Sequence, residues 1–144
     1  LSEKLVRKDH LYIYNLLFDA IQSGELHYKK GDANDLREYI HAADAGKLSV
    51  DVIEDTQYEN KHIILTGTER LKRIDLLTMI NEMMQNQLKI KEVSGNNVGH
   101  YKITPYSYDP ILAKKLVANP FIDLGQGLLG CIKQINNELD QDNS

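Results

Sequence analysis

The chain has 144 residues, of which 42% are hydrophobic and 26% charged, a balance typical of one compact folded domain. Its formal net charge of −4 disfavours a general nucleic-acid-binding surface, and its single cysteine, Cys131, excludes an internal disulfide and any cysteine-based zinc site. No apolar run is long enough to span a membrane and no signal peptide opens the sequence, so we expect a cytoplasmic protein.

The first predicted element is an amphipathic helix over residues 9–22. Its apolar side chains recur at the spacing that places them on one helical face, namely Ile13, Leu16, Leu17, Ala20 and Ile21. Asp9 is placed to cap the start of this helix, and Gly24 follows its end.

Short strands and helices then alternate along the rest of the chain. Two strands are predicted at residues 25–29 and 36–41, joined by a turn-rich segment. A helix follows at 43–54, with Ala45, Leu48 and Val52 facing inward, and then a buried strand at 61–67. A helix is predicted at residues 73–84, followed by extended segments at 88–93 and 100–106. Two further helices are predicted, at 110–119 and from Asp123 onward. The last helix has a shared apolar face formed by Leu124, Leu128, Cys131, Ile132 and Ile135.

This alternation predicts an α/β fold, or α+β if the strands pair antiparallel, with a small mixed sheet and flanking helices. Residues 1–144 are interpreted as a single domain, and residues 137–144 as a polar, solvated tail. Because the first residue is Leu1 rather than methionine, we expect a processed chain or an excerpt of a longer protein.

A glycine motif, G-x-G-x-x-G, occupies Gly125, Gly127 and Gly130. A dinucleotide-binding loop of this spacing needs a strand before it, a helix after it and a second strand about thirty residues on. The preceding residues 119–123 form a poor strand, and too few residues follow. We therefore interpret the motif as coincidental, with small residues that let the last helix approach a neighbour.

Other chemistry-bearing patterns are weak. The five histidines lack the spacing of metal ligands, and the sequence contains no nucleophile elbow, so we assign no metal site and no hydrolase triad. Small basic clusters are interpreted as solvated faces, and they include Arg70, Lys72 and Arg73. The many tyrosines fit either a ligand pocket or ordinary half-buried strand positions.

The most specific pattern is a turn, an Arg-acid-Tyr-Ile-His run and an aspartate at the head of a helix: Arg37, Glu38, Tyr39, Ile40, His41 and Asp44. It resembles the R-[DE]-Y-I-H-V-x-D segment of extended short-chain dehydrogenases/reductases, the NAD-dependent sugar-nucleotide epimerase/dehydratase family. Ala42 stands at the usual valine position. The resemblance covers about residues 9–135 and implies the C-terminal, substrate-binding portion of a longer enzyme whose missing N-terminal domain binds NAD.

Two motifs of that family are absent from the sequence: the glycine-rich cofactor loop and the catalytic Y-x-x-x-K pair. We therefore expect this chain alone to be inactive, with no catalytic residue and no cofactor of its own. By resemblance, the parent enzyme would be an isomerase or a related enzyme that uses NAD, in a pathway such as polysaccharide biosynthesis.

The resemblance also implies which residues bind a nucleoside diphosphate sugar. Arg37 would contact the diphosphate, unless it is a surface arginine paired with Glu38 or Asp35. The base would rest on Leu26, His27 and Tyr28, partly through their backbone groups. A backbone N–H near Leu11 would face phosphate, and the sugar end would be closed by Tyr106 and Tyr108. Structural roles are implied for Tyr39, His41 and Asp44. Residues 100–110 contain no arginine to act as a second phosphate clamp.

An alternative interpretation is a non-enzymatic module of winged-helix type that binds protein or nucleic acid. The order of the predicted elements and the Arg70–Arg73 cluster support it, whereas the net charge of −4 and the lack of a basic recognition helix oppose it. If a cofactor domain is missing, an apolar surface is uncovered and a homodimer becomes possible.

Overall fold

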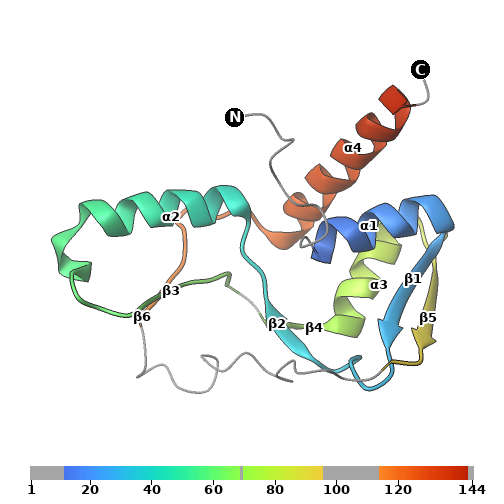
Figure 1. The fold of residues 1–144 in the computed structure, drawn as a ribbon, viewed down its shortest axis with the longest axis horizontal. Helices are drawn as coiled ribbons and strands as arrows, with labels where there is room; N and C mark the ends of the chain where they lie inside the picture. The colour runs from blue at the N-terminus through green and yellow to red at the C-terminus, as the bar shows by residue number, and fades with distance from the viewer. Residues whose placement is uncertain (1–11, 69, 96–113, 143–144) are drawn as a thin grey trace.

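The computed structural model describes residues 12–68, 70–95 and 114–142 (Figure 1). The helices are α1 (Tyr12–Ser23), α2 (Ala42–Glu54), the short 3-10 helix η3 (Thr56–Tyr58), α3 (Arg73–Met83) and α4 (Leu124–Asp142). The strands are β1 (Glu25–Lys29), β2 (Leu36–Glu38), β3 (Ile63–Leu65), β4 (Arg70–Lys72), β5 (Lys89–Val93) and β6 (Lys114–Leu116).

The described strands form three separate two-stranded ladders. β1 pairs with β5 and β3 pairs with β6, both in parallel, whereas β2 and β4 are antiparallel. Strands β1 and β2 are joined by a turn in which Asp32 N donates to Lys29 O and Asp35 N donates to Asp32 O. Each of the two strands then pairs with a different partner. The predicted mixed α/β class is confirmed, although its strands make several small ladders.

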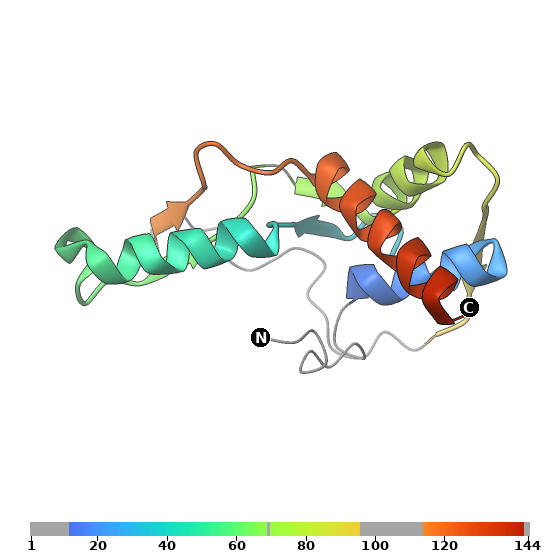
Figure 2. The same cartoon turned by 90° about the horizontal axis from the view of Figure 1, so that it is seen from above.

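The core lies where α1, α3 and α4 pack on the β1–β5 ladder (Figures 1 and 2). Its completely buried large side chains are Leu17, Leu26, Leu76, Leu77, Ile80, Leu128 and Ile135. The apolar stripes predicted for the first and last helices supply much of this set. Gly24, with φ of +71°, ends α1 in the left-handed region that glycine adopts readily.

Helix α2 lies away from this core, beside β3 and β6, and the three elements form an arm (Figures 1 and 2). Its face toward the strands contains the buried Leu48, with Ala45 and Val52 half-buried, as the spacing predicts. Val50 and Ile53 on its other side are exposed. The β2–β4 ladder lies between the arm and the core, so its side chains are held near the centre of the molecule (Figure 1).

Several predicted boundaries were wrong. The helix expected over 110–119 is absent from the described residues 114–119. Lys114–Leu116 is instead strand β6, which pairs in parallel with β3, and this pairing outweighs local helix propensity. The strands predicted at 36–41 and 61–67 are each three residues long. Helix α4 continues to Asp142, so the segment expected as a tail is helical that far, and Leu139 packs against the core. Asp9 and residues 100–113, for which a helix cap and further elements are predicted, lie outside the described residues.

Candidate functional site

The β2–β4 ladder presents the predicted arginine on a defined face. In its register Arg37 lies opposite Leu71, and Arg73 N donates to Asp35 O at 3.0 Å, which extends the pairing by one step. Side chains alternate between the two faces of a strand, and opposite residues in a ladder share a face. One face of the ladder therefore carries Asp35, just before β2, Arg37 in β2 and Arg73 at the start of α3.

Arg37 is held in place by its neighbours along the chain. Its Nη1 donates to Leu36 O at 2.9 Å, and its Nη2 lies 3.4 Å from a carboxylate oxygen of the buried Asp35. The pairing with Asp35 that the sequence left open is therefore present, but it is longer than usual for a guanidinium–carboxylate contact. About a fifth of the Arg37 side chain stays exposed, at 22%.

Tyr12 and Arg73 complete this face. The Arg73 guanidinium lies over the Tyr12 ring, 4.9 Å from its centroid, and Nη1 donates to the tyrosine hydroxyl. Burial raises the pKa of both Tyr12 and Tyr39, and the charges of Arg37 and Arg73 partly oppose that rise. Both arginines thus act electrostatically on both phenols. We call these four residues, Tyr12, Arg37, Tyr39 and Arg73, the arginine cluster.

The opposite face of the ladder has a structural role. Glu38 accepts a hydrogen bond from the Thr66 hydroxyl and pairs with Lys115 Nζ at 3.0 Å. This carboxylate therefore connects β2 to the end of β3 and to β6, which fixes the arm beside the arginine cluster. An ion pair that is only partly solvated in this way holds geometry more than it adds stability.

A cavity of about 200 Å³ lies at the junction of the arm and the core. All three residues expected to be structural line it: Tyr39, His41 and Asp44. His41 Nδ1 accepts a hydrogen bond from Ala43 N at 3.1 Å and so caps α2, while Asp44 Oδ2 accepts one from Ile122 N at 2.7 Å. One polar side-chain atom of each residue is therefore engaged in positioning α2 and the segment before α4.

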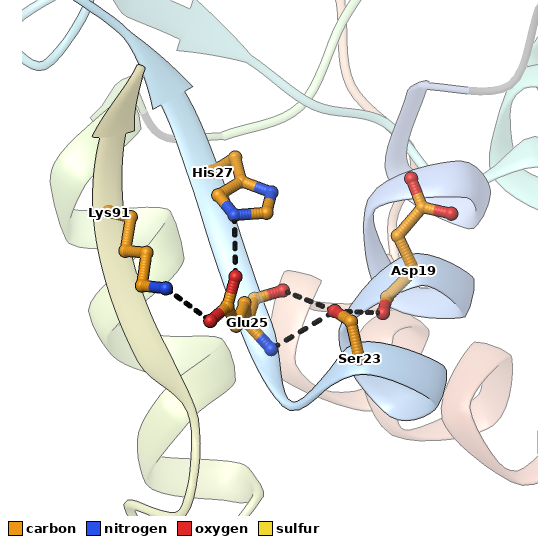
Figure 3. A network of polar contacts seen from close by, with 5 residues as sticks. All are labelled: Asp19, Ser23, Glu25, His27 and Lys91. Atoms are coloured by element: carbon orange, nitrogen blue, oxygen red, sulfur yellow. Dashed lines mark hydrogen bonds and ion pairs between the residues drawn. The ribbon is translucent and has the colours of Figure 1, made fainter.

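The strand expected to support the base, β1, exposes two residues, His27 and Lys29. Leu26 is completely buried in the core, so its side chain cannot contact a ligand, and Tyr28 packs partly against that core. His27 is exposed, and its Nε2 lies 3.0 Å from Glu25, which is also paired with Lys91 (Figure 3). The hydrogen bonds from Lys91 and His27 lower the pKa of Glu25.

The remaining predicted contacts, Leu11, Tyr106 and Tyr108, lie outside the described residues. Tyr12 and Arg73 were missed by the sequence interpretation, which grouped Arg73 with Arg70 and Lys72 as one solvated cluster. The alternation of side chains along residues 70–73 is the signal that distinguishes Arg73 from the other two basic residues. It places Arg70 and Lys72 on the face opposite Arg73.

The glycine motif does not form a cofactor loop. Gly125, Gly127 and Gly130 all lie within α4, whose first turn is capped by Asp123 through the bond from Gln126 N, 3.0 Å. A side chain added at Gly127 would lie 3.2 Å from the His41 ring, so this glycine allows a close approach, as expected. The motif does not fit NAD, and the described residues include no group of three or more side chains placed to hold a metal ion.

Comparisons with known proteins support the fold. A search of solved structures found the UDP-glucuronic acid 4-epimerase from Bacillus cereus, in complex with NAD, at a TM-score of 0.59 and 16% identity. The match covers 85% of this chain and 39% of that epimerase chain. No protein-family model and no curated protein sequence matches. At this identity the likeness shows a shared fold alone, that of part of an NAD-dependent sugar epimerase.

Within the described ranges, no helix is long and apolar enough to cross a membrane.

Proposed function

We propose that this chain is the nucleoside-diphosphate-sugar-binding portion of an NAD-dependent epimerase or dehydratase. The observation that carries this function is the position of Arg37, on a partly open face at the centre of a fold shared with part of an NAD-bound sugar epimerase. A guanidinium gives planar, permanently charged, bidentate recognition of phosphate oxygens. Asp35, 3.4 Å from that guanidinium, helps to orient it.

The redox chemistry belongs, in this proposal, to a domain outside the chain. The only glycine motif of cofactor type is helical, and the catalytic Y-x-x-x-K pair is absent from the sequence. A nicotinamide bound elsewhere would supply the hydride transfer. The residues described here would bind and orient the nucleotide sugar, and we propose no catalytic step for any of them.

An exposed apolar rim supports a contact with that cofactor domain. Val117, Phe121 and Ile122 all line the junction cavity and are substantially exposed. Exposed apolar side chains that cluster in this way favour a partner surface. If the rim instead paired two copies of this chain, sedimentation would show a dimer that the Phe121→Ser substitution dissociates.

The test is a calorimetric titration of UDP-glucose and UDP-glucuronic acid into the wild-type chain, Arg37→Ala and Arg37→Lys. Loss of the guanidinium should weaken binding by about 1.5–3 kcal/mol, the scale of a charge-assisted contact. Arg37→Lys keeps a cation beside the buried Asp35, so it separates loss of the planar fork from an effect on folding. Arg70→Ala, on the opposite face, is the matched control. Equal affinity of wild type and both Arg37 variants would remove Arg37 from the site.

A further inference from the structure

We propose that Arg73 and Tyr12 form a second phosphate contact beside Arg37, so that this face selects a diphosphate over a single phosphate. Its role as a clamp rests on the proposed function of Arg37. The sequence shows no second arginine at residues 100–110, where family resemblance would place one. Arg73 provides the missing cation from a different element, the first residue of α3.

The backbone sets the spacing of the two guanidiniums. Arg37 lies opposite Leu71 in the ladder, and the bond from Arg73 N to Asp35 O places Arg73 one step further along the same face. Residues in this diagonal relation are about 7–8 Å apart, which long side chains span easily. Two bridged phosphates can therefore each meet one guanidinium.

The charge on this face also favours an anion. Arg37 and Arg73 are neighbouring cations, and like charges on diagonal cross-strand positions repel. The buried carboxylate of Asp35 lies 3.4 Å from Arg37, and Asp35 stands opposite Arg73, whose N–H donates to its carbonyl oxygen. Asp32 is a further acidic group whose charge acts on Tyr12. An anion between the guanidiniums would be attracted to both charges and would reduce their mutual repulsion.

Arg73 has an unused donor. Its Nε is buried and has no hydrogen-bond partner within the part of the chain that the structure describes. A buried N–H without an acceptor is unfavourable, so such a group in a folded protein suggests an acceptor supplied from outside. A phosphate oxygen suits this position, because guanidinium groups bind phosphate through adjacent N–H groups.

Tyr12 holds this arginine in place and can itself contact the ligand. Its ring lies under the guanidinium, and its hydroxyl accepts from Nη1. Tyr12 as a whole residue is 43% exposed, so the pair borders solvent. A phenol hydroxyl carries its proton at neutral pH and can donate it to a phosphate oxygen.

The experiment measures the affinity of the whole chain for UDP, UMP and inorganic pyrophosphate by calorimetry. Arg73→Gln should weaken binding of UDP and of pyrophosphate about ten-fold or more, and that of UMP less than about three-fold. Tyr12→Phe removes only the hydroxyl and should weaken UDP binding about two- to three-fold. Arg70→Gln makes the same change in net charge on the opposite face and should change each affinity less than two-fold.

The outcomes separate the second clamp from the proposed function. If Arg37→Lys weakens UDP binding but Arg73→Gln and Arg73→Lys do not, the second clamp is wrong and the nucleotide site stands. If wild type binds pyrophosphate through Arg73 but binds UDP no more tightly than it binds pyrophosphate, the clamp stands and the proposed function fails. Binding of none of the three probes overturns both. Arg73→Lys, which keeps the charge, covers the case in which Arg73→Gln does not fold.

Discussion

Asp44 connects two parts of the chain that are distant in sequence, and its removal has a predictable cost. The carboxylate is buried, with 7% of the residue exposed, and it accepts a hydrogen bond from Ile122 N at 2.7 Å. It also lies in the first turn of α2, where a negative charge interacts favourably with the helix dipole. Asp44→Ala removes both interactions.

The magnitude follows from these two contacts. A hydrogen bond to a charged group contributes about 1.5–3 kcal/mol, and because Ile122 is 39% exposed, water can replace part of it, which favours the lower end. The helix dipole adds about 0.5 kcal/mol. We therefore expect Asp44→Ala to lower the free energy of unfolding by about 2 kcal/mol, or Tm by about 6–8 °C for a domain of this size.

The assay is urea unfolding followed by circular dichroism, with two comparison variants. Asp44→Asn keeps an acceptor but loses the charge, so it should cost about 1 kcal/mol. Ser49→Ala lies on the same helix, where its exposed hydroxyl bonds only the preceding turn, and should cost less than about 0.5 kcal/mol. If Asp44→Ala were as stable as Ser49→Ala, the bond to Ile122 would not hold the arm to the segment before α4.

Two further predictions concern other contacts. Gly67→Ala should destabilise the fold by about 2 kcal/mol or more in the same assay. The added Cβ would lie 1.8 Å from the Tyr39 carbonyl oxygen, so the backbone would have to move. A variant that unfolds at the wild-type midpoint would refute that close approach. Lys91 and His27 lower the pKa of Glu25 in the folded chain. The carboxylate therefore stabilises the fold above about pH 4.5, and this contribution is lost as the pH falls through the lower pKa of the folded state. The stability difference between wild type and Glu25→Gln should therefore shrink from pH 7 to pH 3, and a constant difference would contradict the ion pair.

The helices were the most predictable part of the fold. Apolar residues at helical spacing identified α1, α3 and α4, since burial against one core requires that spacing whatever the partner. The same local reasoning failed at Lys114–Leu116, where pairing with β3 determines the conformation and no local pattern records the partner. Strand partners for β1 and β2 were equally invisible, because pairing is set by contacts between residues far apart in sequence.

The candidate site was predictable only through its motif. Arg37 and its neighbours were identified by their resemblance to a family segment, whereas the contacts that orient them needed coordinates. The arrangement of Arg73 over Tyr12 joins residues 61 positions apart. The side chain of Leu26 proved to lie in the core, so only its backbone groups remain for the predicted ligand contact.

The central claim is that a nucleotide diphosphate binds on the face of the β2–β4 ladder. The most direct test records amide chemical shifts of the uniformly ¹⁵N-labelled chain as UDP is added. The account predicts that the largest shifts cluster at Arg37, Tyr39 and Arg73, and that the far end of α2, near Ile53, is unchanged. Shifts confined to the junction cavity around Asp44 and Phe121, or no saturable shifts at all, would contradict it.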